Sequence, residues 1–185
     1  MTLPLNPGTW VLDDTHSTVE FTARHLGISK VRGRFDRFDA TVTIGDDLGS
    51  CALRAEVDLA SVDTRNADRD AHLRGDDFFD VDNHPKMTFE STRIVATDDG
   101  YDVTGDLTIR GRTSELTLAV QFHGSEVFPG DGSIHAGFSA TGTVSRSAHG
   151  VDFNVPMASS GFVIGDRIGI ELDIQLLPAP ATLPA

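Results

Sequence analysis

Apolar and polar residues alternate along most of the chain. In segment 17–25, STVEFTARH, Val19, Phe21 and Ala23 fall on one face, and Glu20, Thr22 and Arg24 fall on the other. Because successive side chains of a strand point to opposite sides, this pattern predicts a β-strand with one buried face. The pattern recurs often enough along the chain to predict about eight strands.

The other predicted strands show the same spacing. Their apolar faces hold Phe38, Ala40, Val42 and Ile44; Leu53, Ala55, Val57 and Leu59; Met87 and Phe89; Tyr101, Val103, Gly105, Leu107 and Ile109; Leu116, Leu118, Val120 and Phe122; Ile134, Ala136, Phe138, Ala140, Gly142 and Val144; and Ile168, Ile170, Leu172, Ile174 and Leu176. The parity of the apolar positions changes between Phe35 and Phe38, which predicts a bulge there.

Short turn-like segments, GDDLGS, TDDG, RGRTS and FPGDGS, separate several of these strands. Short connections favour antiparallel neighbours, so the sheet either packs as a two-layer sandwich or closes into a barrel. The apolar faces mix large side chains with alanine and glycine, which leaves room inside a barrel for one small ligand. The pattern therefore favours an all-β antiparallel barrel over the sandwich.

One stretch after the third predicted strand breaks the alternation. Within DTRNADRDAHLRGDDFF, Ala67, Ala71 and Leu73 share a face at helical spacing. Asp63, Thr64 or Asn66 is suited to cap the start of a short helix, and Gly75 is suited to end it. We predict one domain over residues 1–177, followed by a disordered Pro/Ala-rich tail over 178–185.

The charge balance narrows the classes of partner. The chain has 28 acidic and 15 basic residues, a formal net charge of −13, which disfavours nucleic acid and anionic membrane surfaces as partners. Eighteen apolar residues never run together, so stable membrane insertion is not expected. The first residues lack the basic and apolar regions of a signal peptide, and we expect a cytoplasmic protein. The single cysteine, Cys51, excludes an internal disulfide framework.

The segment 70–89, DAHLRGDDFFDVDNHPKMTF, raises the question of a metal site. His72 and His84 are twelve residues apart, and the aspartates do not follow the spacing of a calcium loop. We therefore expect this segment to be scaffold, with no metal required. The group Asp13, His16 and Ser17 lacks a nucleophile elbow, so no catalytic residue is predicted.

Several of these motifs resemble the YceI family. The resemblance rests on WVLDDTHSTVEF at 10–21, RDAHLRGDDFFDVDNHP at 69–85, VTGDLTIRGRT at 103–113 and IGIELDI at 168–174. It implies a lipocalin-like barrel whose apolar lumen binds a polyprenyl or quinone-type lipid, with no other cofactor required. The family's Arg-x-Asp-aromatic-Gly motif is only partly matched, since Arg146 and Gly150 are kept but Ala148 and His149 stand between them.

Together the alternation and the resemblance predict a set of side chains in the lumen. They are Val19, Phe21, His25, Phe38, Val42, Val57, Phe89, Leu107, Leu118, Phe138, Ala140 and Ile170. Two other functions stay open: an enzyme that acts on an isoprenoid, with a polar pair drawn from His16, His25, His72 and His149, and a stress-associated interaction module. A homodimer is compatible with each of them.

Overall fold

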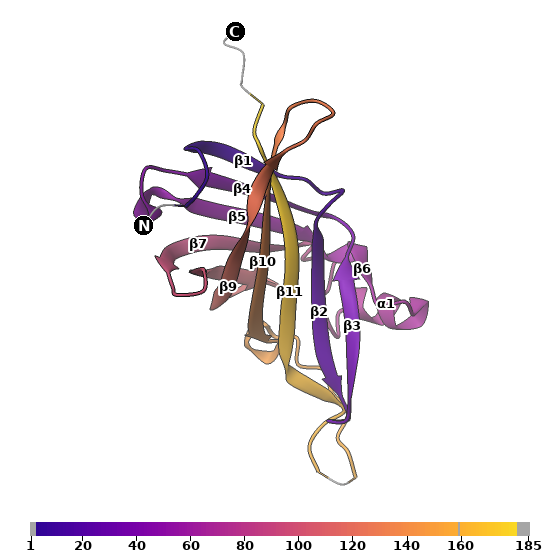
Figure 1. The fold of residues 1–185 in the computed structure, drawn as a ribbon. Helices are drawn as coiled ribbons and strands as arrows, with labels where there is room; N and C mark the ends of the chain where they lie inside the picture. Colours follow the sequence, from indigo (N-terminus) through magenta and orange to yellow (C-terminus); the bar gives the residue numbers. More distant parts are fainter. Residues whose placement is uncertain (1–2, 159, 181–185) are drawn as a thin grey trace.

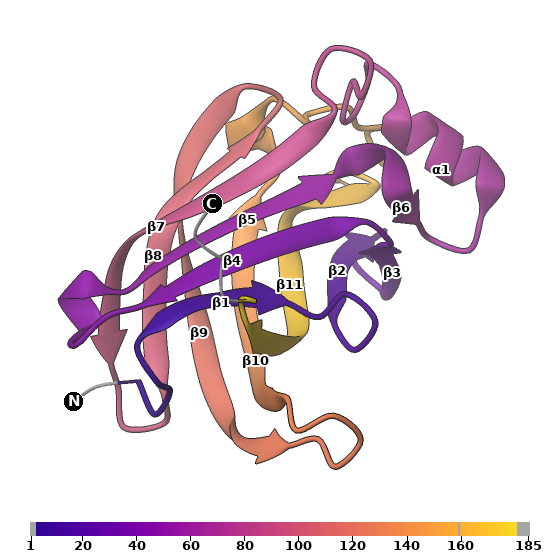
Figure 2. The same cartoon turned by 90° about the horizontal axis from the view of Figure 1, so that it is seen from above.

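The computed structural model describes residues 3–158 and 160–180 and forms a β-barrel (Figures 1 and 2). Within these residues all eleven strands belong to one antiparallel sheet, and eight of them close into a ring. The ring consists of β1 (Gly8–Leu12), β4 (Phe38–Ile44), β5 (Ala52–Asp58), β7 (Lys86–Ala96), β8 (Tyr101–Ile109), β9 (Arg112–Val127), β10 (Ile134–Ser145) and β11 (Ile164–Pro178). The predicted eight-stranded barrel is thus confirmed.

The last strand belongs to two parts of the sheet. At its C-terminal end β11 closes the ring, where Leu176 pairs with Leu12 and Pro178 with Trp10. Over residues 164–173 the same edge of β11 pairs with β2 (Thr18–His25), which continues into β3 (Ser29–Phe35) and β6 (Val62–Asp63). We call these three strands the side sheet, because they diverge from the ring next to β1 and β4 (Figure 2).

The side sheet corrects two details of the sequence prediction. The parity change between Phe35 and Phe38 is not a bulge, because β3 ends at Phe35 and β4 begins at Phe38 with different partners. The helix α1 (Ala67–Arg74) follows the sixth strand, not the third. Short strands such as β6 carry too few residues to show alternation.

The caps of α1 agree with the prediction. The Asn66 side-chain oxygen accepts a hydrogen bond from the Arg69 N–H (2.9 Å), and the Gly75 N–H donates to the His72 carbonyl (3.1 Å). Inside the first turn the buried Asp70 carboxylate accepts from both the N–H and the hydroxyl of Thr64. Short 3-10 turns, η1 (Leu48–Ser50), η2 (Leu59–Ser61) and η3 (Ser147–His149), complete the elements.

The apolar faces of the ring strands point inward and form the core. Its two largest parts centre on Phe89, Leu107 and Leu118 near α1, and on Trp10 and Leu176 at the other end. In the described part of the chain, no helix is long and apolar enough to cross a bilayer. Pro178 still pairs in β11, while residues 181–185 of the predicted tail lie outside the described residues.

Candidate functional site

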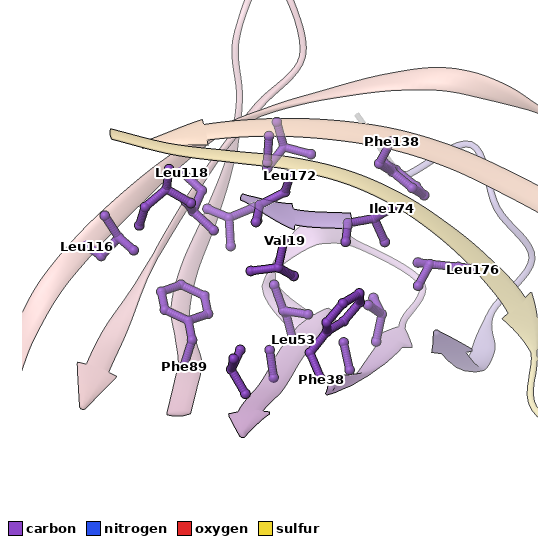
Figure 3. Close-up of a pocket in the computed structure, with 18 of the residues that line it drawn as sticks. Val19, Phe38, Leu53, Phe89, Leu116, Leu118, Phe138, Leu172, Ile174 and Leu176 are labelled. Carbon is purple, nitrogen blue, oxygen red and sulfur yellow. The ribbon is translucent and has the colours of Figure 1, made fainter. Parts of the chain in front are cut away.

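The barrel contains a cavity of about 200 Å³ that is partly open to solvent. Side chains from opposite walls point into this shared space, including Phe38 and Leu53 on one side and Leu172 and Ile174 on the other (Figure 3). All four come from the inward-facing positions of their strands. The cavity exists because alternation places one apolar face of every ring strand inside, while small residues such as Ala55 and Ala140 leave part of the volume unfilled.

Ten of the twelve side chains predicted to line the lumen do line this cavity. They are Val19, Phe38, Val42, Val57, Phe89, Leu107, Leu118, Phe138, Ala140 and Ile170. The structure does not show a ligand contact for any of them. They lie on the inward-facing side of the sheet, as the alternation of apolar and polar residues predicted.

Phe21 and His25 were placed in the lumen and lie elsewhere. Both are in β2 beyond Val19, where the side sheet has left the ring. The Phe21 ring packs over Gly33 and lies 5.5 Å from the Phe35 ring, centroid to centroid. His25 pairs with Ser29 next to the β2–β3 turn, at the far end of the side sheet. The alternation identifies the apolar face of β2 correctly, but beyond Val19 this face packs within the side sheet and does not reach the cavity.

Other lining residues were missing from the predicted set. Most of them occupy the same inward positions, and the alternation was sufficient to find them: Ala40, Ile44, Leu53, Ala55, Met87, Tyr101, Val103, Leu116, Val120, Leu172, Ile174 and Leu176. Leu3 and Ile94 had no such signal. Leu3 precedes the first strand, and Ile94 follows a bulge in β7 between Ser91 and Arg93 that shifts the register.

Polar side chains are rare in the lining. Among the described residues that line the cavity, Asp39, Thr88 and Tyr101 carry a polar side chain. Asp39 is exposed, and its carboxylate accepts a hydrogen bond from the Ala40 N–H (2.8 Å). Of these three, Tyr101, at the start of β8, is the buried one.

One part of the wall is built without hydrogen bonds between strands. Val19 of β2 and residues 38–40 of β4 line the same cavity, although β2 and β4 are not paired. Side chains fill the space between them: Phe38 and Val19 pack on a cluster that contains Phe35 and Val57. We call this contact the seam. At the seam, side-chain packing takes the place of the hydrogen bonds that join the other neighbouring strands of the wall.

Aromatic side chains close the barrel at the α1 end. Phe78 is buried, and its ring centroid lies 4.9 Å from that of His72 and 5.4 Å from that of Phe153. Phe79 packs on Phe35 at 5.9 Å. The acidic segment that raised the question of a metal site therefore supplies a plug of aromatic rings, as the scaffold interpretation expected.

The loop around Arg146 completes this closed end. The buried guanidinium donates hydrogen bonds to the carbonyl oxygens of Val151 (2.6 Å), Phe153 (3.0 Å) and Gly165 (3.1 Å). Burial lowers the pKa of Arg146, and the nearby carboxylates of Asp166 and Asp152 oppose that effect. The guanidinium stays protonated and ties the loop to β11.

His149 has a structural role in the same loop. Its side chain is fully buried; Nδ1 lies 2.8 Å from the Arg112 carbonyl oxygen and Nε2 lies 2.9 Å from the Ser114 hydroxyl. Since a carbonyl only accepts, Nδ1 donates to the Arg112 carbonyl oxygen, while Nε2 pairs with the Ser114 hydroxyl. His149 is thus a packed structural side chain and does not line the cavity.

The opposite end carries a polar network around Asp13. Burial by itself would raise the pKa of Asp13, but hydrogen bonds from Thr15, His16 and Gln175 outweigh it and hold the pKa well below its usual range. The Ser17 hydroxyl accepts from the Gln175 N–H (2.9 Å). The DDTHS segment thus fixes the entry to β2 against β11, which is the structural role favoured by the sequence.

The structure gives no support to a catalytic pair among the four histidines considered for one. His16 bonds Asp13, His72 bonds Asp77, and His149 bonds Ser114, while His25 lies near the β2–β3 turn; none of them lines the cavity. Over residues 3–158 and 160–180, three or more His, Cys, Asp or Glu side chains nowhere cluster as a metal site would require. Metal independence itself stays a prediction.

The comparison with known families agrees with the barrel and its apolar cavity. The model of the YceI-like domain matches residues 10–176. The chain belongs to the YceI-like family. The match runs from Trp10 in β1 to Leu176 in β11, so it covers the whole ring and the side sheet.

Relatives of this chain occur in several bacteria. A UPF0312 protein of Staphylococcus aureus is 38% identical over 168 residues, which cover 90% of this chain and 95% of that protein. The crystal structure of BcnA from Burkholderia cenocepacia is similar with a TM-score of 0.75 at 24% identity, covering 89% of this chain and 98% of that one. A polyisoprenoid binding domain from Saccharophagus degradans, implicated in plant cell wall breakdown, has a TM-score of 0.64 at 16% identity, covering 91% and 98%. The two structural likenesses concern the fold.

Proposed function

We propose that this protein binds an isoprenoid-type lipid, a polyprenyl chain or a quinone with a polyprenyl tail, inside the barrel, for transport, storage or sequestration. The observation that carries the proposal is the almost wholly apolar lining of the cavity in a YceI-like barrel. Such a lining offers little to orient a polar substrate and suits a hydrocarbon chain. The polyisoprenoid binding domain from Saccharophagus degradans shares this fold and supports the choice of lipid class.

The energetics favour a ligand with several isoprene units. Each buried methylene contributes about 0.8 kcal/mol before the cost of ordering the chain is subtracted. Branched methyl groups fit beside the small residues Ala55 and Ala140, where a straight chain would leave gaps. We therefore expect isoprenoid chains to bind more tightly than linear fatty chains of equal carbon number.

The polar end of the ligand is proposed to lie at Tyr101. A phenol both donates and accepts hydrogen bonds, so it suits a quinone carbonyl or an alcohol. Entry is proposed to take place at the seam, where Asp39 marks the point at which the cavity lining reaches solvent.

Organic extraction of the purified protein followed by mass spectrometry tests the lipid class. We expect an isoprenoid lipid in near-stoichiometric amount, and competition between a fluorescent polyprenyl alcohol and unlabelled lipids to favour isoprenoids over fatty acids. Tyr101→Phe should weaken binding of a quinone or an alcohol and leave binding of a plain polyprenyl hydrocarbon unchanged. A folded protein that yields no lipid and binds no isoprenoid probe would contradict the proposal.

A further inference from the structure

Exposed apolar side chains gather at the end of the side sheet. Leu26 (39% exposed) and Ile28 (81%) lie in the β2–β3 turn, and Val155 (49%) and Phe162 (59%) lie in the loop that precedes β11. The two loops are in contact, because the Leu26 N–H donates to the Val163 carbonyl (2.8 Å). They form one projection at the end of the molecule where β2, β3 and the start of β11 meet (Figure 1). We call Leu26, Ile28, Val155 and Phe162 the apolar tip.

The side-sheet surface next to this tip is basic, although the protein as a whole is acidic and the loop that precedes β11 carries the exposed Asp152. Residues 21–35 contain Arg24, Lys30, Arg32 and Arg34 and no aspartate or glutamate, in a chain of net charge −13. Arg24 and Lys30 are directly opposite in the β2–β3 ladder, and Arg32 follows on the same outer face. Arg34 pairs with carboxylates, whereas in the described part of the chain the other three are exposed and form no ion pair. The side chains of Arg24, Lys30 and Arg32, close to the apolar tip, are therefore available to an external anion.

The opposite end of the molecule provides a comparison. The β9–β10 turn also exposes apolar side chains, Val127 (60%) and Phe128 (52%). Residues 121–139 contain Glu126 and Asp131 and no lysine or arginine. The two ends thus present similar apolar surface with opposite local charge, so only the side-sheet end is complementary to an anionic partner.

We propose that the apolar tip and the adjacent Arg24, Lys30 and Arg32 dock the protein on the surface of a bilayer that contains anionic lipids. Apolar side chains at the tip enter the boundary between head groups and acyl chains, while the basic side chains meet the head groups. A few apolar side chains alone, or a few basic side chains alone, bind a bilayer weakly, and the two together give stable attachment. The acidic remainder opposes this little, because charges farther than about 8 Å from the surface are screened at physiological salt.

Docking in this orientation brings the barrel to the source of an apolar ligand. Val19, which lines the cavity, lies six residues along β2 from His25, a distance of about 20 Å in a strand. The inference does not depend on which lipid fills the barrel, since the tip is separate from the lining.

Flotation with lipid vesicles tests the inference. The wild type is mixed with vesicles of phosphatidylcholine alone or of equal parts phosphatidylcholine and phosphatidylserine. We expect binding to the mixed vesicles, weakened by added salt, and little binding to phosphatidylcholine alone. Ile28→Ser should lower partitioning at least about tenfold, and Lys30→Gln about fivefold. Phe128→Ser, which removes a comparable apolar side chain at the acidic end, should change nothing.

Three results would overturn it: no binding to mixed vesicles, equal binding to both kinds of vesicle, or equal losses in Ile28→Ser and Phe128→Ser. A further contrary result is self-association of the wild type in analytical ultracentrifugation that only Ile28→Ser abolishes, because a second copy would then cover the tip. Ile28 is 81% exposed, so its replacement should leave thermal unfolding unchanged and the comparison interpretable.

Discussion

Placing a carboxyl group in the cavity separates an open lumen from a packed core. Ala140 is 7% exposed, lies in β10 and lines the cavity. Ala140→Asp should leave the barrel folded and remove lipid binding. The reason is that the empty cavity of about 200 Å³ has room for water, which occupies about 30 Å³ per molecule in the liquid, whereas a bound hydrocarbon chain would exclude that water from the carboxyl group.

Protonation limits the part of the folding cost that comes from the charge of the new carboxylate, and water in the cavity reduces the desolvation cost of the neutral carboxyl. With an ordinary pKa of about 3.9, holding it neutral at pH 7 costs about 4 kcal/mol, at 1.36 kcal/mol per pH unit. Domains unfold with about 5–15 kcal/mol, so most of them tolerate that loss. Lipid binding should lose a larger share of its free energy than folding does, because an apolar chain cannot hydrogen-bond the carboxyl. A loss of about 3–4 kcal/mol corresponds to a loss in affinity of roughly 10²–10³-fold.

Thr143→Asp is the matched control. Thr143 is on the same strand, points outward, is exposed and stands opposite Gly169 of β11. Titration with a fluorescent polyprenyl alcohol gives the affinity, and thermal unfolding gives the stability. We expect Ala140→Asp to unfold cooperatively and bind poorly, with binding partly recovered as the pH falls and the carboxyl protonates. A folded Ala140→Asp protein with wild-type affinity refutes the lumen as the binding site, and an unfolded one indicates a filled core.

Three further predictions concern stability. Phe78→Ala should lower the free energy of unfolding by about 3–5 kcal/mol, because it empties the aromatic plug at the α1 end, while Phe162→Ala in an exposed loop should change it little; chemical denaturation measures both. The lowered pKa of Asp13 means that its carboxylate stabilises the fold above about pH 4, and that this contribution disappears as the pH falls toward the pKa in the folded state. Asp13→Asn should therefore be less stable than the wild type at neutral pH, and its free energy of unfolding should change less between about pH 4 and 2. Equal acid sensitivity in both proteins would contradict this. Unfolding midpoints with and without a chelator should coincide, and a drop of many degrees on chelation would reveal a structural metal.

Seven of the eight ring strands and most of the lining could be predicted from alternation alone. These seven are long enough to show their period, and Val42, Leu107 and Ile170 all fall on the inward side as expected. The five-residue β1 was not predicted, and the strand predicted at 17–25 is β2 of the side sheet. Asn66 was likewise recognisable as the N-cap because its side-chain oxygen can accept from the first turn, and Gly75 because glycine is common where helices end, although its backbone here is extended.

The division of the sheet could not be read in this way. Alternation shows that Phe21 has a buried side but not which partner covers it, and that depends on where β2 leaves the ring. Ile94 is placed inward by a bulge that depends on strand pairing. The role of His149 rests on two partners, Arg112 and Ser114, that are more than thirty positions away in sequence.

The shared strand β11 also governs how the chain can fold during synthesis. It supplies partners to β10, β2 and β1, and the pairing of Leu12 with Leu176 joins the first of the strands to the last. Hairpins such as β8–β9 and β2–β3 can form as soon as they emerge from the ribosome, and β1 can pair with β4, but the second edge of β1 and of β2 must wait for β11, translated about 150 residues later. Until then one edge of each of these strands stays open, and an open strand edge is a site of non-native pairing during folding.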